Sequence, residues 1–207
     1  MTSATAQNRD NLARDFLPAG YKSTILQQFV NSLGRWQDAQ ILDIGPVCQE
    51  NITYFAFRMR KHYACDMFLR LKREGSKGLS SGDVWRHLDY PPRNFDGIQL
   101  WDLIDHLDDG EVSQLVSLCY SMLRATGLLM LIAFEKEPAL PTTSTFVIGQ
   151  DYHISLRPQP HLKLSWHCRH NRALMSLMGG FNIVKSFQYR NGLREFLYEK
   201  PGLCRDE

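Results

Sequence analysis

The chain has 207 residues, which is the length of one ordinary domain. Hydrophobic residues make up 43% of the chain, enough for a substantial core, and this excludes a wholly disordered protein. The 24 basic and 22 acidic residues give a net charge of +2, so we do not expect a dedicated nucleic-acid-binding protein, whose phosphate contacts need a surplus of Lys and Arg.

The sequence gives no indication of membrane insertion or export. The longest uninterrupted apolar run, residues 128–134, has the length of a strand and falls far short of the roughly 18 residues of a membrane helix. Residues 1–16 are polar and lack the apolar stretch of a signal peptide. The 5 cysteines form no C-x-x-C pair, which predicts reduced thiols and a cytoplasmic protein. We expect a flexible N-terminal arm at 1–20 and a single domain at 21–207.

The first third of the chain alternates helix and strand signals. Apolar residues recur at helical spacing over 21–33, which predicts an amphipathic helix that ends at a glycine. Residues 40–45 form a short apolar run closed by Gly and Pro, as is typical of a buried strand. We then expect a helix over 49–61, a second strand at 62–66 that ends on a carboxylate, and a helix over 67–73.

The middle of the chain begins with a stretch rich in Gly and Ser, 74–82, which predicts a flexible loop. A weak third strand is expected at 84–88, and a fourth at 95–101 after a Pro-Pro turn. Asp108 has a glutamate three residues later, which is the pattern of a capping box, and the helix that it starts should run to about residue 124.

The last third carries the strongest strand signal, at 127–134. Residues 136–160 are rich in Pro and Thr and predict an irregular excursion, which is followed by a helix over 165–178. The segments 181–189 and 193–200 flank an Asn-Gly pair and predict a β-hairpin, because this pair supplies the positive φ angles of a tight turn.

This order of elements predicts an α/β fold. Strands and helices that alternate up to residue 134 indicate a doubly wound, mostly parallel sheet, here of seven strands, with helices on both faces. The terminal hairpin adds a C-terminal antiparallel pair. In such sheets the ligand lies over the C-terminal ends of the strands, where strand order reverses, so the residues just after each strand are the candidates for a site.

Glycine and acidic residues follow these strands. The first strand leads into a turn at Gly45, where a ligand could approach the backbone closely. Asp66 ends the second strand, 23 residues after Asp43, a distance at which a carboxylate commonly accepts hydrogen bonds from ribose hydroxyls. Asp89 and Asp102 follow the next two strands. Asp66 and Asp89 equally fit helix N-caps or turn residues.

Together, these pieces resemble the class I S-adenosylmethionine-dependent methyltransferases over about residues 21–200. The matching pieces are ILDIG at 41–45, HYACD at 62–66, LDYPPRNFDGI at 88–98, LWDLIDHL at 100–107, LRATGLLMLIAFE at 123–135 and the terminal hairpin. Each piece alone is weak, and their order carries the likeness.

The resemblance implies S-adenosylmethionine as the cofactor and a role for each strand end. Gly45 and its neighbours would let the backbone contact the methionine portion, Asp66 would hold the ribose hydroxyls, and the region of Asp89 would face the adenine. Trp101 would line the floor near the sulfonium. The full candidate cofactor-binding set is Asp43, Gly45, Pro46, Val47, Asp66, Met67, Asp89 and Trp101.

One departure from the family concerns the glycine-rich turn, which usually reads D-x-G-x-G-x-G. Here Val47 and Gln49 stand where the second and third glycines are expected, and Pro46 stiffens the turn and removes a backbone donor. Such a turn could still admit the cofactor, or it could mark a domain that has lost cofactor binding.

Candidate catalytic residues follow the fourth strand. Asp102 and His106 are predicted to act as the base, with Asp105 beside them, and His106 titrates nearest neutral pH. His106 equally fits a turn residue that bonds a backbone carbonyl. The acceptor is expected to be a small molecule or a side chain, covered by the N-terminal segment 16–22 and the excursion 136–160.

Three other interpretations compete with a methyltransferase. A nicotinamide-dependent oxidoreductase would need G-x-G-x-x-G after the first strand, which Val47 breaks. A non-catalytic methyltransferase-like interaction domain would explain the missing glycines. A metal site among Cys168, His167 and His170 has suitable ligands but no fourth ligand at a fitting spacing, so no metal is expected.

Overall fold

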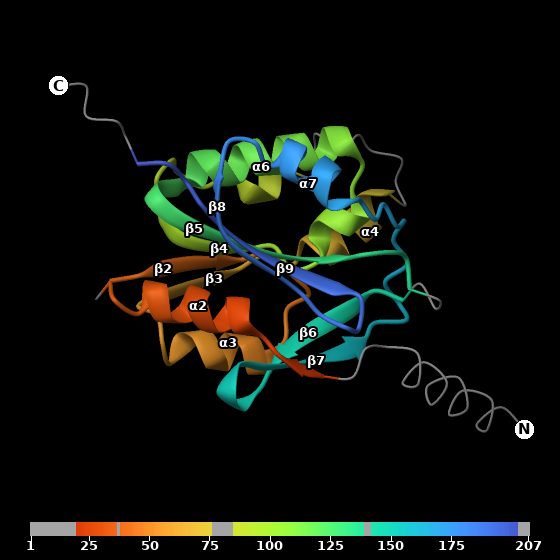
Figure 1. The fold of residues 1–207 in the computed structure, drawn as a ribbon, viewed down its shortest axis with the longest axis horizontal. Coiled ribbons are helices and arrows are strands. Elements are labelled where there is room, and N and C mark those ends of the chain that lie inside the picture. The colour runs from red at the N-terminus through yellow and green to blue at the C-terminus, as the bar shows by residue number, and fades with distance from the viewer. Residues whose placement is uncertain (1–19, 37, 76–84, 139–141, 203–207) are drawn as a thin grey trace, which may run out of the picture.

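A computed structural model describes residues 20–36, 38–75, 85–138 and 142–202 (Figure 1). The arm expected at 1–20 lies outside these residues except for Gly20, and the loop expected at 74–82 lies outside them from residue 76 onward. Within the described ranges, the helices are all too short or too polar to cross a membrane.

A six-stranded mixed sheet forms the centre of the fold, in the order β3-β2-β4-β5-β9-β8. The pairings β3–β2, β2–β4 and β4–β5 are parallel, whereas β5–β9 and β9–β8 are antiparallel. The strands are β2 Gln40–Asp43, β3 Lys61–Ala64, β4 Phe95–Gln99, β5 Leu123–Phe134, β8 Asn182–Gln188 and β9 Leu193–Glu199. The parallel strands therefore present their C-terminal ends at one edge, as the sequence predicts.

Helices cover both faces of this sheet (Figure 1). Alternate residues of β5 separate the two cores: Leu128 and Met130 pack with α2 and α3, whereas Leu129 and Leu131 pack with α4, α6 and α7. The helices are α2 Thr24–Leu33, α3 Gln49–Ala56, α4 Met67–Gly75, α6 Asp109–Met122 and α7 Asn171–Leu177. The predicted capping box is confirmed, because the Asp108 carboxylate accepts a hydrogen bond from the Glu111 N–H at 2.8 Å.

The predicted seven-stranded sheet is wrong by one strand. The segment expected as a third strand at 84–88 contains instead the short 3₁₀ helix η1, Trp85–Leu88. Trp85 and Leu88 are both buried and stand three residues apart, which is a helical spacing and not the alternation of a strand.

The excursion at 136–160 is not irregular. It contains β6 Ser144–Ile148 and β7 His153–Pro158, which pair antiparallel and join β1 Tyr21–Lys22 in a separate sheet of order β1-β7-β6. The connection between β6 and β7 passes through residues with positive φ, Asp151 at 50° and Tyr152 at 61°. Pro and Thr in the sequence concealed this hairpin because they are also the residues of loops.

The helix expected over 165–178 forms only in its second half, as α7. The segment 165–170 has no regular secondary structure because its polar groups bond to the short 3₁₀ helix η2, Leu103–His106, and to the residue after it: the His167 N–H donates to the Asp105 carbonyl at 2.6 Å, and the Arg169 guanidinium donates to the carbonyls of Ile104 and Leu107. The terminal hairpin is confirmed, with Gly192 at φ 82° in its turn.

Candidate functional site

The turn after β2 and the carboxylate after β3 lie against each other. The Val47 N–H donates to Oδ2 of Asp66 at 3.4 Å, and the other oxygen, Oδ1, accepts from the Leu69 N–H at 2.8 Å. Asp66 is therefore an N-cap of α4, as one of its two interpretations predicts, and it also contacts the turn after β2. Val47 is 45% exposed and Asp66 is half-buried, so this contact lies at the surface. The candidate cofactor site, from Asp66 over the turn after β2 to Trp101, is called the crevice below.

The other end of the turn is filled by an indole ring. A Cβ atom added at Gly45 would lie 2.2 Å from Cδ1 and 2.6 Å from Nε1 of Trp101, so the ring rests directly on the glycine. Trp101 is only 1% exposed. Its ring stacks on Phe146 of β6, with centroids 5.6 Å apart and planes inclined by 14°. The glycine is thus used for close approach, but by a side chain of the same protein.

Asp43, at the end of β2, is also engaged inside the protein. Its Oδ1 accepts a hydrogen bond of 2.6 Å from Nε1 of Trp101, and its Oδ2 lies 3.6 Å from Nε2 of His62. Asp43 is buried, so its carboxylate is held between an indole and an imidazole and is not presented to solvent.

The remaining predicted cofactor residues are dispersed. Pro46 is buried beside Gly45. Met67 is fully buried in the core beneath α4, so its side chain does not face the crevice. Asp89 follows η1 and is exposed. Its segment lies alongside the end of β3, because Sγ of Cys65 is 3.8 Å from the carbonyl of His87.

Asp102, Asp105 and His106 form a buried cluster at the end of β4. Nε2 of His106 lies 3.6 Å from Oδ2 of Asp102. Oδ2 of Asp105 accepts a hydrogen bond of 2.6 Å from the Phe134 N–H. Neither oxygen of Asp102 has a hydrogen-bond partner among the described residues, and the same holds for Oδ1 of Asp105. A buried carboxylate without a donor is costly, so this cluster has the unsatisfied polar character of a functional site.

The protonation of this cluster is shifted by its burial and its neighbours. Burial alone favours neutral His106, but the Asp102 carboxylate and the Ser165 carbonyl outweigh it and raise the pKa of His106. Nδ1 of His106 lies 2.9 Å from the Ser165 carbonyl, so Nδ1 carries the proton that bonds there. Burial raises the pKa of Asp105 to about 7, although the Phe134 N–H opposes this shift.

The segment 165–170 covers the cluster. Trp166 packs on His106 with ring centroids 4.4 Å apart, and on Phe134 with centroids 5.2 Å apart. On the outer side, a surface hollow of about 490 Å³ is lined by Lys72, Glu111, Lys163 and others, and His106 borders it although its imidazole is buried. His167 and His170 stand in this non-helical segment, not on one helix face, and the described residues contain no cluster of three or more metal-ligating side chains.

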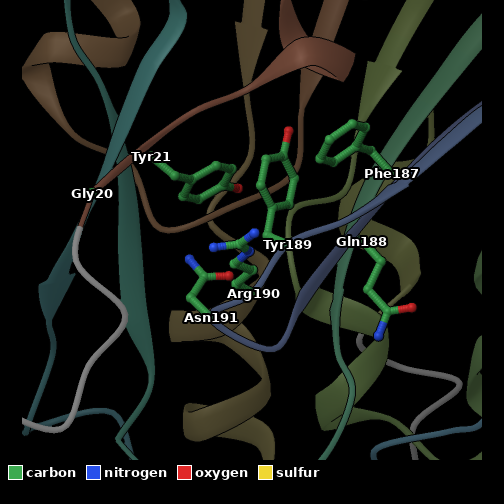
Figure 2. Close-up of a pocket in the computed structure, with 7 residues that line it drawn as sticks. All are labelled: Gly20, Tyr21, Phe187, Gln188, Tyr189, Arg190 and Asn191. Atoms are coloured by element: carbon green, nitrogen blue, oxygen red, sulfur yellow. The ribbon is translucent and has the colours of Figure 1, made fainter.

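A second hollow of about 490 Å³ lies at the tip of the β8–β9 hairpin, lined by Gly20, Tyr21 and residues 187–191 (Figure 2). The rings of Tyr21 and Tyr189 lie 4.4 Å apart. Both hydroxyls donate to the carboxylate of Glu195, at 2.8 and 2.7 Å, so they are engaged in the interior. This hollow therefore offers ring surfaces and no free hydroxyl of these two tyrosines.

Three residues of the site region were not singled out from the sequence. Glu195 is fully buried and also accepts from Ser23 Oγ at 2.8 Å; the available signal was a charged residue at an inward position of an apolar strand. Phe146 and Asn51 gave no signal, because their roles depend on how the 136–160 segment docks. Asn51 donates to the Phe146 carbonyl and accepts from the Ile148 N–H, both at 2.8 Å, which fixes β6 against α3.

Comparison with known proteins identifies solved structures of similar fold. No protein-family model and no curated protein matches the chain. An S-adenosylmethionine-dependent methyltransferase from Clostridium acetobutylicum matches 96% of this chain and 98% of its own, with a TM-score of 0.58 and 11% identity. The N-methyltransferase NodS from Bradyrhizobium japonicum matches 97% and 98%, with a TM-score of 0.52 and 12% identity.

A third structure holds ligands. The 1,6-didemethyltoxoflavin-N1-methyltransferase of Burkholderia thailandensis, with bound 1,6-didemethyltoxoflavin and S-adenosylhomocysteine, matches 96% of this chain and 84% of its own, with a TM-score of 0.50 and 14% identity. At such identities the likeness defines the fold alone. This chain has the class I S-adenosylmethionine-dependent methyltransferase fold, in agreement with the resemblance of its sequence pieces.

The residues at the crevice fit only part of such a cofactor. At the exposed end, a carboxylate and a short turn stand together, as a ribose would require. At the buried end, the indole of Trp101 takes the space over Gly45 and the hydrogen-bonding capacity of one Asp43 oxygen. A carboxylate that could accept ribose hydroxyls is therefore present, whereas the space over Gly45 is filled while the indole is in this position.

Proposed function

We propose that this protein is an S-adenosylmethionine-dependent methyltransferase whose cofactor binds at the C-terminal ends of β2 and β3. The observation that carries the proposal is the contact between the Asp66 carboxylate and the Val47 N–H, which brings the acid of β3 to the turn of β2. Asp66 holds the ribose hydroxyls, and the segment of Asp89 borders the adenine.

The bound cofactor would supply an electrophilic methyl group on a sulfonium. The protein then has to orient the acceptor and remove its proton. Asp102 and His106 form the pair that does this: His106 Nδ1 is held by the Ser165 carbonyl, and Nε2 faces Asp102. Burial lowers the pKa of His106, but the Asp102 carboxylate outweighs it and raises that pKa, so the neutral imidazole that accepts a proton forms at a higher pH than for an ordinary histidine.

The acceptor is a small molecule or a protein side chain. The hollow that His106 borders is the proposed acceptor site, and the buried imidazole would have to become accessible from it. One protein of the same fold supports a small acceptor: the one from Burkholderia thailandensis holds 1,6-didemethyltoxoflavin. A cytoplasmic location is part of this proposal, and it is supported by the free thiols of Cys48, Cys65, Cys119 and Cys168.

Titration calorimetry with S-adenosylmethionine and S-adenosylhomocysteine tests this proposal through Asp66→Ser. Serine keeps the N-cap of α4, so the fold is retained, but its hydroxyl is too short to hold a ribose. We expect millimolar or tighter binding to the wild type and at least about tenfold weaker binding to Asp66→Ser. The control is Asp38→Ser, which removes an exposed carboxylate paired with Arg60. If neither ligand gives heat or a thermal shift with the wild type, the proposal of methyltransferase activity is wrong.

A second candidate function is a non-catalytic interaction domain built on the same fold. The specific observation in its favour is Trp101, which fills the buried end of the crevice. This candidate predicts that no substitution at Trp101 or Asp66 changes the affinity for any adenosyl ligand, which separates it from the first.

A further inference from the structure

Trp101 fills the space over Gly45 at one end of the crevice. Its ring rests on Gly45, whereas Val47, two residues further along the same turn, is 45% exposed and contacts Asp66. The boundary between filled and accessible space therefore falls within a single turn of the backbone.

Three separate contacts hold the indole in place. Asp43 accepts a 2.6 Å hydrogen bond from the indole N–H, and Phe146 stacks on the face of the ring. Gly45, which has no side chain, lies directly against the ring. Phe146 is in turn fixed to α3 through Asn51, so the indole is enclosed by a strand, β6, that is distant from it in the sequence. Such a set of contacts is more than is needed to bury one side chain.

The backbone at Trp101 has the unusual conformation that this placement requires. Its φ angle is 49°, in the left-handed region that a bulky residue adopts at a cost of about 1–3 kcal/mol. Strain of this kind persists where the surrounding contacts over-determine it, and it concentrates at ligand sites and switches. The chain therefore bears a cost to aim an indole at the turn after β2.

We propose that Trp101 restricts the crevice to the nucleoside part of an adenosyl ligand, so that the amino-acid tail enters only when the indole leaves Gly45. This inference rests on the proposed site between Val47 and Asp66 and assigns Trp101 as its specificity-determining residue. A nucleoside without a tail needs only the open end. A ligand with the tail must break the Asp43 hydrogen bond and the Phe146 stack before its tail can enter; otherwise only its nucleoside part binds.

The energetic consequence follows from population shift. A ligand that binds only the open state has its affinity reduced by the fraction of molecules in that state. In a variant without the indole, the space over Gly45 is always free, so the affinity for a ligand with the amino-acid tail rises. It leaves the affinity for a tail-free nucleoside nearly unchanged, because that ligand never required the ring to move.

Calorimetric titration of adenosine and of S-adenosylhomocysteine into wild type, Trp101→Ala and Trp101→Phe tests this directly. In the wild type we expect dissociation constants within about threefold of each other, because the tail contributes little. In Trp101→Ala, S-adenosylhomocysteine should bind at least about tenfold more tightly while adenosine changes by less than about threefold. Trp101→Phe preserves most of the packing and should shift S-adenosylhomocysteine in the same direction, which keeps the test decisive if Trp101→Ala does not fold.

The matched control is Trp166→Phe, since Trp166 is an indole packed on His106 and Phe134 and not on Gly45; neither affinity should change. S-adenosylhomocysteine that binds the wild type over about thirtyfold more tightly than adenosine, with no gain on substitution of Trp101, would overturn this inference and leave the proposed function intact. Absence of binding by both ligands to all variants would overturn both.

Discussion

The indole N–H of Trp101 donates a 2.6 Å hydrogen bond to the carboxylate of Asp43, and this pair closes one end of a crevice whose other end remains accessible at Asp66. The two residues come from the ends of neighbouring parallel strands, β4 and β2. The C-terminal edge of the parallel strands therefore carries both a carboxylate that could bind a ribose and an indole that fills the space beside it.

Gly45→Ala should destabilise the protein strongly because the new Cβ would meet the Trp101 ring at 2.2 Å. We expect a loss of about 2–3 kcal/mol in the free energy of unfolding, measured by urea denaturation. Gly180→Ala is the control, since its Cβ would lie 3.6 Å from the nearest atoms of Tyr120. The double variant Gly45→Ala/Trp101→Ala should show clear non-additivity, and simple additivity would mean that the two sites do not touch.

Asn51→Ala should release β6 from α3. The substitution leaves the Phe146 carbonyl and the Ile148 N–H without partners in a buried position, at an expected cost of about 2–4 kcal/mol. Hydrogen exchange should also become faster at residues 144–148. Asn31→Ala provides the comparison, because Asn31 bonds the Tyr152 hydroxyl at the surface and its loss should cost less than about 0.5 kcal/mol. Equal losses for the two variants would contradict the role of Asn51.

Asp105→Asn should change how stability depends on pH. The pKa of Asp105 is raised from its ordinary value of 3.8 to about 7, so between these values the folded protein binds a proton that the unfolded chain releases. Stability from this group is fully present below about pH 4 and is lost as the pH rises through about 7. The variant lacks this loss, so it should exceed the wild type in stability at pH 8 by on the order of 2–4 kcal/mol, but not at pH 4.

Urea denaturation at a series of pH values measures that difference, with Asp38→Asn as a control for an exposed carboxylate. Parallel stability curves for wild type and Asp105→Asn would show that the buried carboxyl does not titrate in this range.

Glu195→Ala should separate β1 and α2 from the terminal hairpin. The carboxylate accepts hydroxyl hydrogen bonds from Tyr21, Ser23 and Tyr189, and all three donors would lose their acceptor. We expect a loss of about 3 kcal/mol or more in the free energy of unfolding. Glu199→Ala, at the far end of the same strand, is the comparison and should have a much smaller effect. A loss below about 1 kcal/mol in Glu195→Ala would refute the structural role of the network.

Much of the architecture could be predicted from the sequence because its signals are local. The capping box at Asp108, the Asn-Gly turn and the apolar runs of the parallel strands each depend on neighbouring residues only. The excursion and the segment 165–170 could not be predicted, because long-range partners decide their backbone: β1 pairs with β7, and Arg169 bonds carbonyls of the turn after β4.

The candidate site likewise has features that local sequence signals predict and features that depend on long-range partners. The sequence places Gly45, Asp66 and Asp102 at strand ends, since that follows from the order of elements. The resemblance to the methyltransferases also implies Trp101 at the floor of the site, but it does not reveal that the ring rests on Gly45. The direction of that side chain depends on a positive φ angle and on Phe146, which is 45 positions away in the sequence.

The most direct measurement is a crystal structure of the protein grown with S-adenosylhomocysteine at high concentration. The account predicts the ribose hydroxyls within hydrogen-bond distance of the Asp66 carboxylate, and an ordered amino-acid tail over Gly45 only in molecules whose Trp101 ring has moved away. A nucleoside bound far from Asp66, or a fully ordered tail beside an unmoved indole, would contradict it.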